Sequence, residues 1–183
     1  QQQVTNVDQS TANKHDSSHP NIFLLNVTSL KKPHAMQQLT TDINRGNYQI
    51  VFVTESWLSS KQQTSTFDIP GYHMQRRDRV RRVGGGLCTY IADYFNIAEF
   101  SVPSALPTVE IFWTHCTFNN KQYFLANCYY PPKPKHSVQQ FVGQLITTID
   151  FIMTSFTEPY FVIAGDFNDL DTTFLQTDYG FFF

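Results

Sequence analysis

Apolar and polar residues occur in blocks along the first third of the chain, and these blocks predict a strand–helix–strand unit. Residues 22–25 and 49–54 form short, largely continuous apolar runs, typical of strands buried on both faces. Between them, residues 34–45 carry apolar side chains at the three- and four-residue spacing of one helix face: Met36, Leu39 and Ile43. Gly46 is the predicted stop of this helix. Two strands joined through a helix predict parallel neighbours with a right-handed crossover.

The second half of the chain repeats this mixture of strand and helix patterns. A strongly amphipathic stretch over residues 138–153 predicts a helix. Asn119 and Asn120 stand between two strand-like runs and predict a hairpin, because Asn tolerates the backbone angles of a tight turn. The predicted strands are residues 87–92, 109–118, 122–130 and 160–164. Strands with two intervening helices indicate a layered α/β or α+β domain.

The two ends of the chain differ from the rest in composition. Residues 1–20 have almost no apolar side chains, so they predict a disordered leader followed by one domain over residues 21–183. A chain of 183 residues is long enough for one domain with a substantial core. The last three residues are all Phe, and contiguous exposed aromatic side chains favour association. We therefore expect the chain to be truncated at its C-terminus.

Composition narrows the class of protein. The 17 Phe and 9 Tyr residues favour a β-rich or α/β interior over a helical bundle. The formal net charge of −2 does not by itself indicate a nucleic-acid-binding protein. No apolar run is long enough to span a membrane and no secretory signal is present, so we expect a nuclear or cytoplasmic protein that is not secreted. Three widely spaced cysteines are expected to be buried and reduced: Cys88, Cys116 and Cys128.

Polar side chains stand where the predicted strands end. Such strand ends favour a shared crevice, which is where ligand sites form in layered α/β proteins. Each of these residues also has an ordinary structural explanation, such as a turn, a cap or an Asx-turn. The sharpest single signal is the sequence Gly-Asp-Phe-Asn directly after the last strand. The candidates are Asn26, Glu55, Tyr129 or Tyr130, Asp166 and Asn168.

Together these side chains suit hydrolysis of a phosphodiester by in-line attack of water. Such a reaction needs a divalent cation, a group that orients the water and donors for the phosphate oxygens. Glu55 is a hard oxygen ligand suited to Mg²⁺, and Asp166 is suited to positioning or deprotonating the water. Asn26 and Asn168 offer amide donors, and a Tyr hydroxyl is a donor to a non-bridging oxygen.

Six motifs occur in the order seen in the endonuclease/exonuclease/phosphatase superfamily, and the chain resembles that superfamily from about residue 21 to its end. Three of them look most like the endonucleases of LINE-type (non-LTR) retrotransposons: Thr-Glu-Ser-Trp-Leu, Arg-Asp-Arg followed by a triple Gly, and Tyr-x-Pro-Pro. The motifs are Asn26–Leu30, Thr54–Leu58, Ile69–Tyr72, Gly84–Leu87, Tyr129–Pro132 and Gly165–Asn168.

The resemblance implies an α/β fold, a two-sheet β-sandwich flanked by helices (DNase I-like), with the final strands missing. It implies Mg²⁺ as cofactor, with Mn²⁺ as an alternative, Glu55 as metal ligand and DNA as partner. It favours Tyr129 over Tyr130 as the catalytic Tyr, with Asn26 beside the metal and Asp166 and Asn168 holding water and phosphate. The Ser-Asp-His segment that the superfamily carries near its C-terminus does not occur here, so we expect little activity from this chain. A reverse transcriptase is the expected fusion partner.

Five arginines fall within seven residues, directly before a triple glycine. The segment is interpreted either as a solvated loop or as a contact to the DNA backbone, because arginines neutralise phosphates without reading sequence. The predicted DNA contacts are Arg76, Arg77, Arg79 and Arg82, with Arg81 in the same cluster. The glycines favour close backbone packing or a flexible turn over a phosphate cradle, since no helix begins after them.

Two other functions stay open at this point. One is a phosphodiesterase or phosphatase of the same superfamily that acts on abasic DNA or on a lipid phosphate. The other is a degenerate, non-catalytic remnant that at most binds nucleic acid. Cleavage of intact DNA, abasic DNA and phosphoinositide separates the enzymatic alternatives, and loss of activity in Glu55→Gln separates an enzyme from a remnant.

Overall fold

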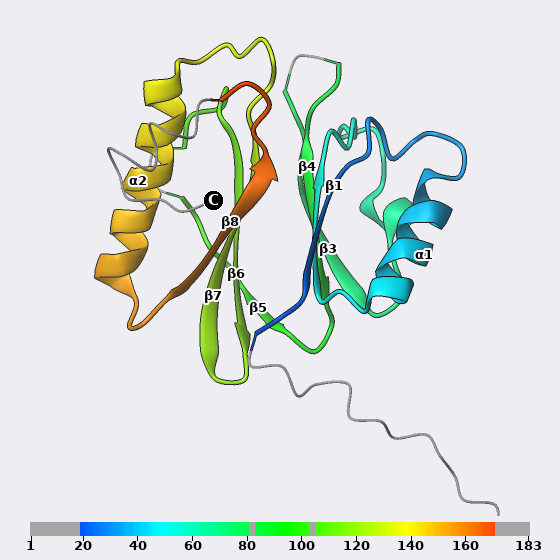
Figure 1. Cartoon of the computed structure of the whole chain (residues 1–183), viewed down its shortest axis with the longest axis horizontal. Coiled ribbons are helices and arrows are strands. Elements are labelled where there is room, and N and C mark those ends of the chain that lie inside the picture. Colours follow the sequence, from blue (N-terminus) through cyan, green and yellow to red (C-terminus); the bar gives the residue numbers. More distant parts are fainter. Residues whose placement is uncertain (1–18, 81–82, 103–104, 171–183) are drawn as a thin grey trace, which may run out of the picture.

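The computed structural model describes residues 19–80, 83–102 and 105–170. Within these ranges the chain forms two facing four-stranded sheets, each covered on its outer side by one helix (Figure 1). The α/β sandwich flanked by helices is the predicted fold. The predicted leader lies outside the described residues except for its last two positions, and the Phe-rich end lies outside them entirely.

The first sheet has the strand order β1-β2-β4-β3. Its strands are β1 (Ile22–Asn26), β2 (Ile50–Thr54), β3 (Tyr72–Arg77) and β4 (Leu87–Ala92). The predicted unit is confirmed, because β1 and β2 are parallel and the helix α1 (Ala35–Gly46) connects them. A short 3-10 helix, η1 (Thr64–Phe67), lies between β2 and β3. The helix stop is Asn47, which has a left-handed backbone, and Gly46 is the last helical residue.

The second sheet has the order β5-β6-β7-β8. Asn119 and Asn120 both have positive φ, 48° and 57°, so the predicted hairpin closes through the turn that these residues favour. The helix α2 (Val138–Ser155) begins with a capping box between Ser137 and Gln140. The strands are β5 (Asn96–Ala98), β6 (Glu110–Phe118), β7 (Lys121–Tyr129) and β8 (Tyr160–Asp166).

Alternating side chains of the central strands build three apolar layers. On β2, Val51 and Val53 pack toward α1, whereas Ile50 and Phe52 pack between the two sheets. Successive side chains of a strand point to opposite faces, so a strand covered on both sides is apolar throughout, and all five residues of β2 are buried.

The three cysteines are free and buried, as expected. None of the helices in the described ranges is long and apolar enough to cross a membrane.

Two predictions about local structure are wrong, and the strand β5 was not predicted. The strand at residues 22–25 is not buried on both faces: β1 is an edge strand, and Ile22 and Leu24 are 37% and 40% exposed. The segment after the predicted turn at residues 69–72 is not a solvated loop throughout, because Arg76 and Arg77 end β3. The short strand β5 has only three residues and no pattern that marks it in the sequence.

Candidate active site

Four strand ends meet at one end of the sandwich. The parallel pairs β1–β2 and β7–β8 each end on the same side of their sheet, and Asn26 and Asp166 come together from the two sheets there. In Figure 1 the arrow of β8 ends beside β1 at this end of the molecule. Each pair is parallel because a helix returns the chain to the starting side, so both sheets bring the ends of these strands to the same end of the sandwich.

Glu55 follows β2 at this end of the sandwich and has three hydrogen-bond donors. The Tyr129 hydroxyl donates to Oε1 over 2.6 Å, and the Trp57 indole donates to Oε2 over 3.1 Å. The Asn26 amide lies 3.4 Å from Oε1. Glu55 has a positive φ of 55°, a costly backbone conformation for this residue type, and such conformations gather at functional sites.

The surroundings of Glu55 and Tyr129 set their protonation. Partial burial raises the pKa of Glu55, but the hydrogen bonds from Tyr129, Trp57 and Asn26 and the nearby Arg79 together hold that pKa below its usual value. The pKa of Tyr129 is raised far above its usual value, mainly by burial and in addition by the hydrogen bond to Glu55. At neutral pH Glu55 is therefore a carboxylate and Tyr129 a neutral donor.

Asp166 joins the same cluster through Asn26. The Asn26 amide donates to Asp166 Oδ2 over 2.7 Å, so one amide group connects the two carboxylates. The other oxygen of Asp166 accepts from the backbone N–H of Asn168 over 3.1 Å, which is the Asx-turn that such a sequence favours. The Asn168 amide donates to the carbonyl of Tyr130 over 2.9 Å and ties the ends of β7 and β8 together.

The motif Gly-Asp-Phe-Asn is explained residue by residue. A Cβ added to Gly165 would lie 1.9 Å from the Cys128 carbonyl oxygen, so β8 approaches β7 too closely for any side chain there. Phe167 packs against the core beneath α2, at 6.4 Å from the ring of Phe141. The partly buried Phe side chain anchors the loop, while Asp166 contacts Asn26 and Asn168 contacts the end of β7.

The three described arginines of the predicted DNA contact all have protein partners. Arg76 donates to the carbonyl of Gln62 over 2.7 Å, and Arg77 donates to the carbonyls of Ile111 and Leu106 over 2.6 and 3.2 Å. Arg79 forms an ion pair with Glu110. Arg82 lies outside the described residues. The guanidinium groups of Arg76, Arg77 and Arg79 therefore bind other parts of the protein itself: the loop at Gln62, the start of β6 and the loop before β6.

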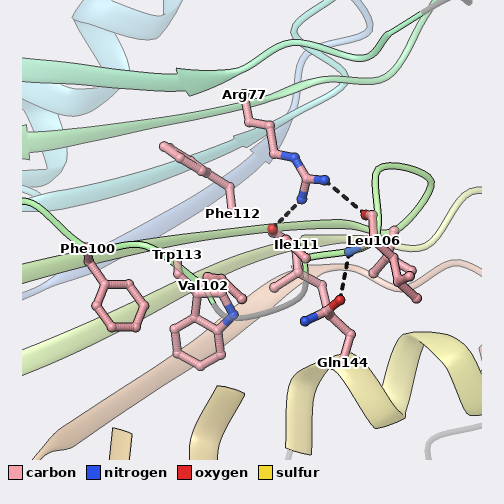
Figure 2. Close-up of a pocket in the computed structure, with 10 residues that line it drawn as sticks. Arg77, Phe100, Val102, Leu106, Ile111, Phe112, Trp113 and Gln144 are labelled. Atoms are coloured by element: carbon pink, nitrogen blue, oxygen red, sulfur yellow. Dashed lines mark hydrogen bonds between the residues drawn. The ribbon is translucent and has the colours of Figure 1, made fainter. Parts of the chain in front are cut away.

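A separate apolar pocket of about 160 Å³ lies between α2, β6 and the loop before β6 (Figure 2). Arg77 closes one side of it, and Gln144 Oε1 accepts from the backbone N–H of Leu106 over 2.8 Å at another. None of the residues that surround Glu55 lines this pocket. The candidate chemistry thus belongs to the side chains clustered at the strand ends and not to this pocket.

Solved structures with a similar backbone were found, whereas no family profile and no curated protein matches the chain. One is TDP2 from C. elegans, with a TM-score of 0.61 and 12% identity, matched over 81% of this chain and 48% of that one. D. rerio TDP2 complexed with single strand DNA product has a TM-score of 0.58 and 16% identity, over 85% and 63%. AP endonuclease LMAP from Leishmania major has a TM-score of 0.55 and 15% identity, over 89% and 60%.

The fold is DNase I-like. At these identities the comparison concerns the backbone alone. The chain spans about half the length of the C. elegans protein and about six tenths of the other two.

Asn127 is a residue of the DNase I-like sandwich that the sequence analysis did not single out. It is fully buried between the sheets, and its amide donates to the carbonyls of Val53 over 3.2 Å and Cys88 over 2.8 Å. It therefore links β7 to β2 and β4, two residues before Tyr129 and two before Glu55. The available signal was a lone amide inside an otherwise apolar strand, since buried polar groups are kept where they are hydrogen-bonded.

Replacing Asn127 by Leu is expected to destabilise the protein by about 2 kcal/mol, because two buried carbonyls lose their donor. Urea unfolding followed by circular dichroism measures this change. Asn96→Ala, on exposed β5, is the matched control and is expected to change stability by less than about 0.5 kcal/mol. Equal stability of Asn127→Leu and the native protein would show that the amide does not hold the sheets together.

Proposed function

We propose that the chain is the DNA-nicking part of a divalent-cation-dependent phosphodiesterase of the LINE retrotransposon type. The observation that carries the proposal is the Asn26 amide, which joins the carboxylates of Glu55 and Asp166 while Tyr129 donates to Glu55. Four strand ends from two sheets are needed to assemble this group. A turn or cap requires none of these contacts between distant parts of the chain.

The side chains present fit Mg²⁺. This ion takes one or two carboxylates and keeps most of its water, and Glu55 and Asp166 are two partly exposed carboxylates at one crevice. Mn²⁺ accepts the same oxygen donors. Within the described ranges there is no cluster of three or more His, Cys, Asp or Glu residues, the kind of set that zinc sites use. Glu55 is the proposed ligand, and the bound ion would neutralise charge on the phosphate.

The proposed mechanism assigns one task to each side chain. Asp166 orients a water molecule and takes its proton as the water oxygen attacks phosphorus and the bond to the leaving sugar oxygen breaks. Tyr129 remains protonated, so its hydroxyl can donate to a non-bridging phosphate oxygen. Asn26 keeps the carboxylates at a fixed separation, and Asn168 holds the loop after β8 in place. The exposed remaining hydrogen of the Asn168 amide is the proposed phosphate donor.

DNA is the proposed substrate. Two of the similar structures are an AP endonuclease and a TDP2 complexed with single strand DNA product, and the motifs in this sequence resemble LINE endonucleases. Arg79, whose guanidinium lies over the ring of Tyr129, also lines a groove of about 430 Å³. Val80, Pro107, Pro131 and Lys135 line it, so it offers both apolar surface and a cation to a nucleic acid strand. Contacts of DNA with Arg76, Arg77 and Arg82, and fusion to a reverse transcriptase, stay predictions, whereas Arg79 is assigned a different role below.

A plasmid-nicking assay tests the proposal. Supercoiled plasmid is incubated with Mg²⁺, Mn²⁺ or EDTA, using the 183-residue chain and a chain extended in frame through a Ser-Asp-His segment. We expect cation-dependent nicking by the extended chain and little by the shorter one, because that segment does not occur in the shorter sequence. Robust nicking by the shorter chain would refute the expected inactivity, and no nicking by the extended chain would count against the enzyme. Abasic DNA and phosphoinositide are the comparison substrates.

A further inference from the structure

We propose that Arg79 and Glu110 are positioning residues, which fix Tyr129 and through it Glu55, and that Arg79 is not a contact to the DNA backbone. The inference rests on the proposed role of Glu55 as cation ligand. It assigns a task to two residues that the proposed mechanism does not use, and to the triple glycine next to them.

Arg79 and Glu110 form a largely buried pair. Both Nε and Nη2 of Arg79 donate to Glu110 Oε1, the first over 2.7 Å, and the two side chains are 16% and 10% exposed. The second oxygen of Glu110 accepts from the backbone N–H of Gly86 over 2.9 Å. One carboxylate therefore holds the start of β6, the arginine and the glycine loop together. Charge-assisted hydrogen bonds of this kind fix geometry more firmly than neutral ones.

The guanidinium of Arg79 lies over the ring of Tyr129, with 5.5 Å from Cζ to the ring centroid. A cation at this distance from an aromatic face is attracted by the ring and restricts its position. Tyr129 in turn donates to Glu55 over 2.6 Å. The contacts form a continuous chain from Glu110 through Arg79 and Tyr129 to the proposed cation ligand.

Two of the three consecutive glycines are required by this arrangement. Gly85 has a φ of 67°, and a Cβ there would lie 2.1 Å from Arg79 Cζ; a Cβ on Gly86 would lie 2.7 Å from Ser56 Oγ. The carbonyls of these two glycines accept from the backbone N–H groups of Trp57 and Ser56 over 2.9 and 3.1 Å. The glycine loop thus packs directly on the turn that carries Glu55, which supports the close-packing interpretation made from the sequence.

A phosphate contact would need a different environment for Arg79. Its charge is already compensated by Glu110, and little of its side chain is exposed. The two roles also predict opposite changes in cation affinity when Arg79 is replaced. Removal of a positive charge beside a cation site strengthens cation binding by electrostatics alone. Removal of a positioning residue weakens cation binding, because replacing a residue that holds a metal ligand in place typically lowers metal affinity about 10- to 100-fold.

The test measures Mn²⁺ affinity by quenching of tryptophan fluorescence in the 183-residue chain. The Trp57 indole donates to Glu55, so it lies next to the proposed ion, whereas Trp113 is buried in the core beneath α2. We expect Arg79→Met and Glu110→Gln each to weaken Mn²⁺ binding about tenfold. The double variant is expected to lose little more than either single variant, because the two residues act as one unit. Arg45→Met, an exposed arginine at the end of α1, is the matched control and is expected to leave the affinity unchanged.

Arg79→Lys separates positioning from loss of fold, because it keeps the charge but not the planar fork, and we expect an intermediate affinity at near-native thermal stability. Unchanged or tighter Mn²⁺ binding in Arg79→Met would overturn the inference. Absence of quenching in the native protein would instead remove the proposed cation site. The metal-free indole N–H resonance of Trp57 then decides the positioning claim. A shift in Arg79→Met but not in Arg45→Met supports it, and an unmoved resonance overturns it.

Discussion

Replacement of Glu55 by Gln is expected to lower the nicking rate of the extended chain about a thousandfold. A bound cation supplies several kcal/mol of stabilisation to the developing charge on a phosphate, and about 1.4 kcal/mol corresponds to a factor of ten in rate. Gln has nearly the shape of Glu and retains an acceptor for Tyr129, but it lacks the negative charge that holds the ion. The measurement is the initial rate of plasmid relaxation at saturating Mg²⁺.

Glu99→Gln is the control for this substitution, because Glu99 is an exposed residue just after β5 and makes the same change of charge. It is expected to nick at the native rate. If Glu55→Gln nicks as fast as Glu99→Gln, the assignment of the metal ligand is wrong. If neither the native extended chain nor either variant nicks DNA, the interpretation of the chain as a non-catalytic remnant gains support.

Replacement of Gly165 by Ala is expected to destabilise the protein by about 3 kcal/mol, the upper range for overpacking in a core. The new methyl group would lie 1.9 Å from the carbonyl oxygen of Cys128. Both atoms belong to paired strands, so no flexible side chain can move aside, and β8 must separate from β7. Asp166 ends β8, and we therefore expect the variant to lose Mn²⁺ binding as well. Urea unfolding and Mn²⁺ titration measure the two effects.

Gly143→Ala is the matched control, because Gly143 is an exposed position of α2 with nothing within 4 Å of an added Cβ. Alanine is favoured over glycine inside helices, so this variant is expected to gain up to about 1 kcal/mol. A loss of stability in Gly165→Ala and a gain in Gly143→Ala would show that the surroundings of each glycine decide the effect of the added methyl group. A Gly165→Ala protein as stable as the native chain would show that the strands can separate without cost.

The sequence predicted those elements whose pattern of apolar residues reflects the surfaces that they bury. The strand β2 is covered by α1 and by the second sheet, and its unbroken apolar run reflects this. The helix α2 has one buried face and a capping box, both of which are visible in the sequence. The strand β1 has a similar apolar run but lies at a sheet edge, and no local pattern distinguishes an edge strand from a central one.

The sequence predicted that the candidate residues lie at strand ends, where each ends a strand or comes just after one, but it did not predict the contacts between them. Asn26 bridges Glu55 and Asp166 because the two sheets face each other closely at this point. No local sequence pattern encodes the distance between the sheets. The partner of Arg79 is Glu110, which is 31 residues away and belongs to the other sheet. A cluster of arginines therefore suggested DNA, although three of its members bind other residues of the protein itself.

The central claim is that side chains from two sheets converge on one divalent cation, and counting bound Mn²⁺ by electron paramagnetic resonance tests it most directly. The claim predicts a single Mn²⁺ bound to the native 183-residue chain, loss of that ion in Glu55→Gln, weakened binding in Asp166→Asn, and native binding in Glu99→Gln. No bound ion in the native chain, or an ion that stays bound at native affinity in Glu55→Gln, would contradict it.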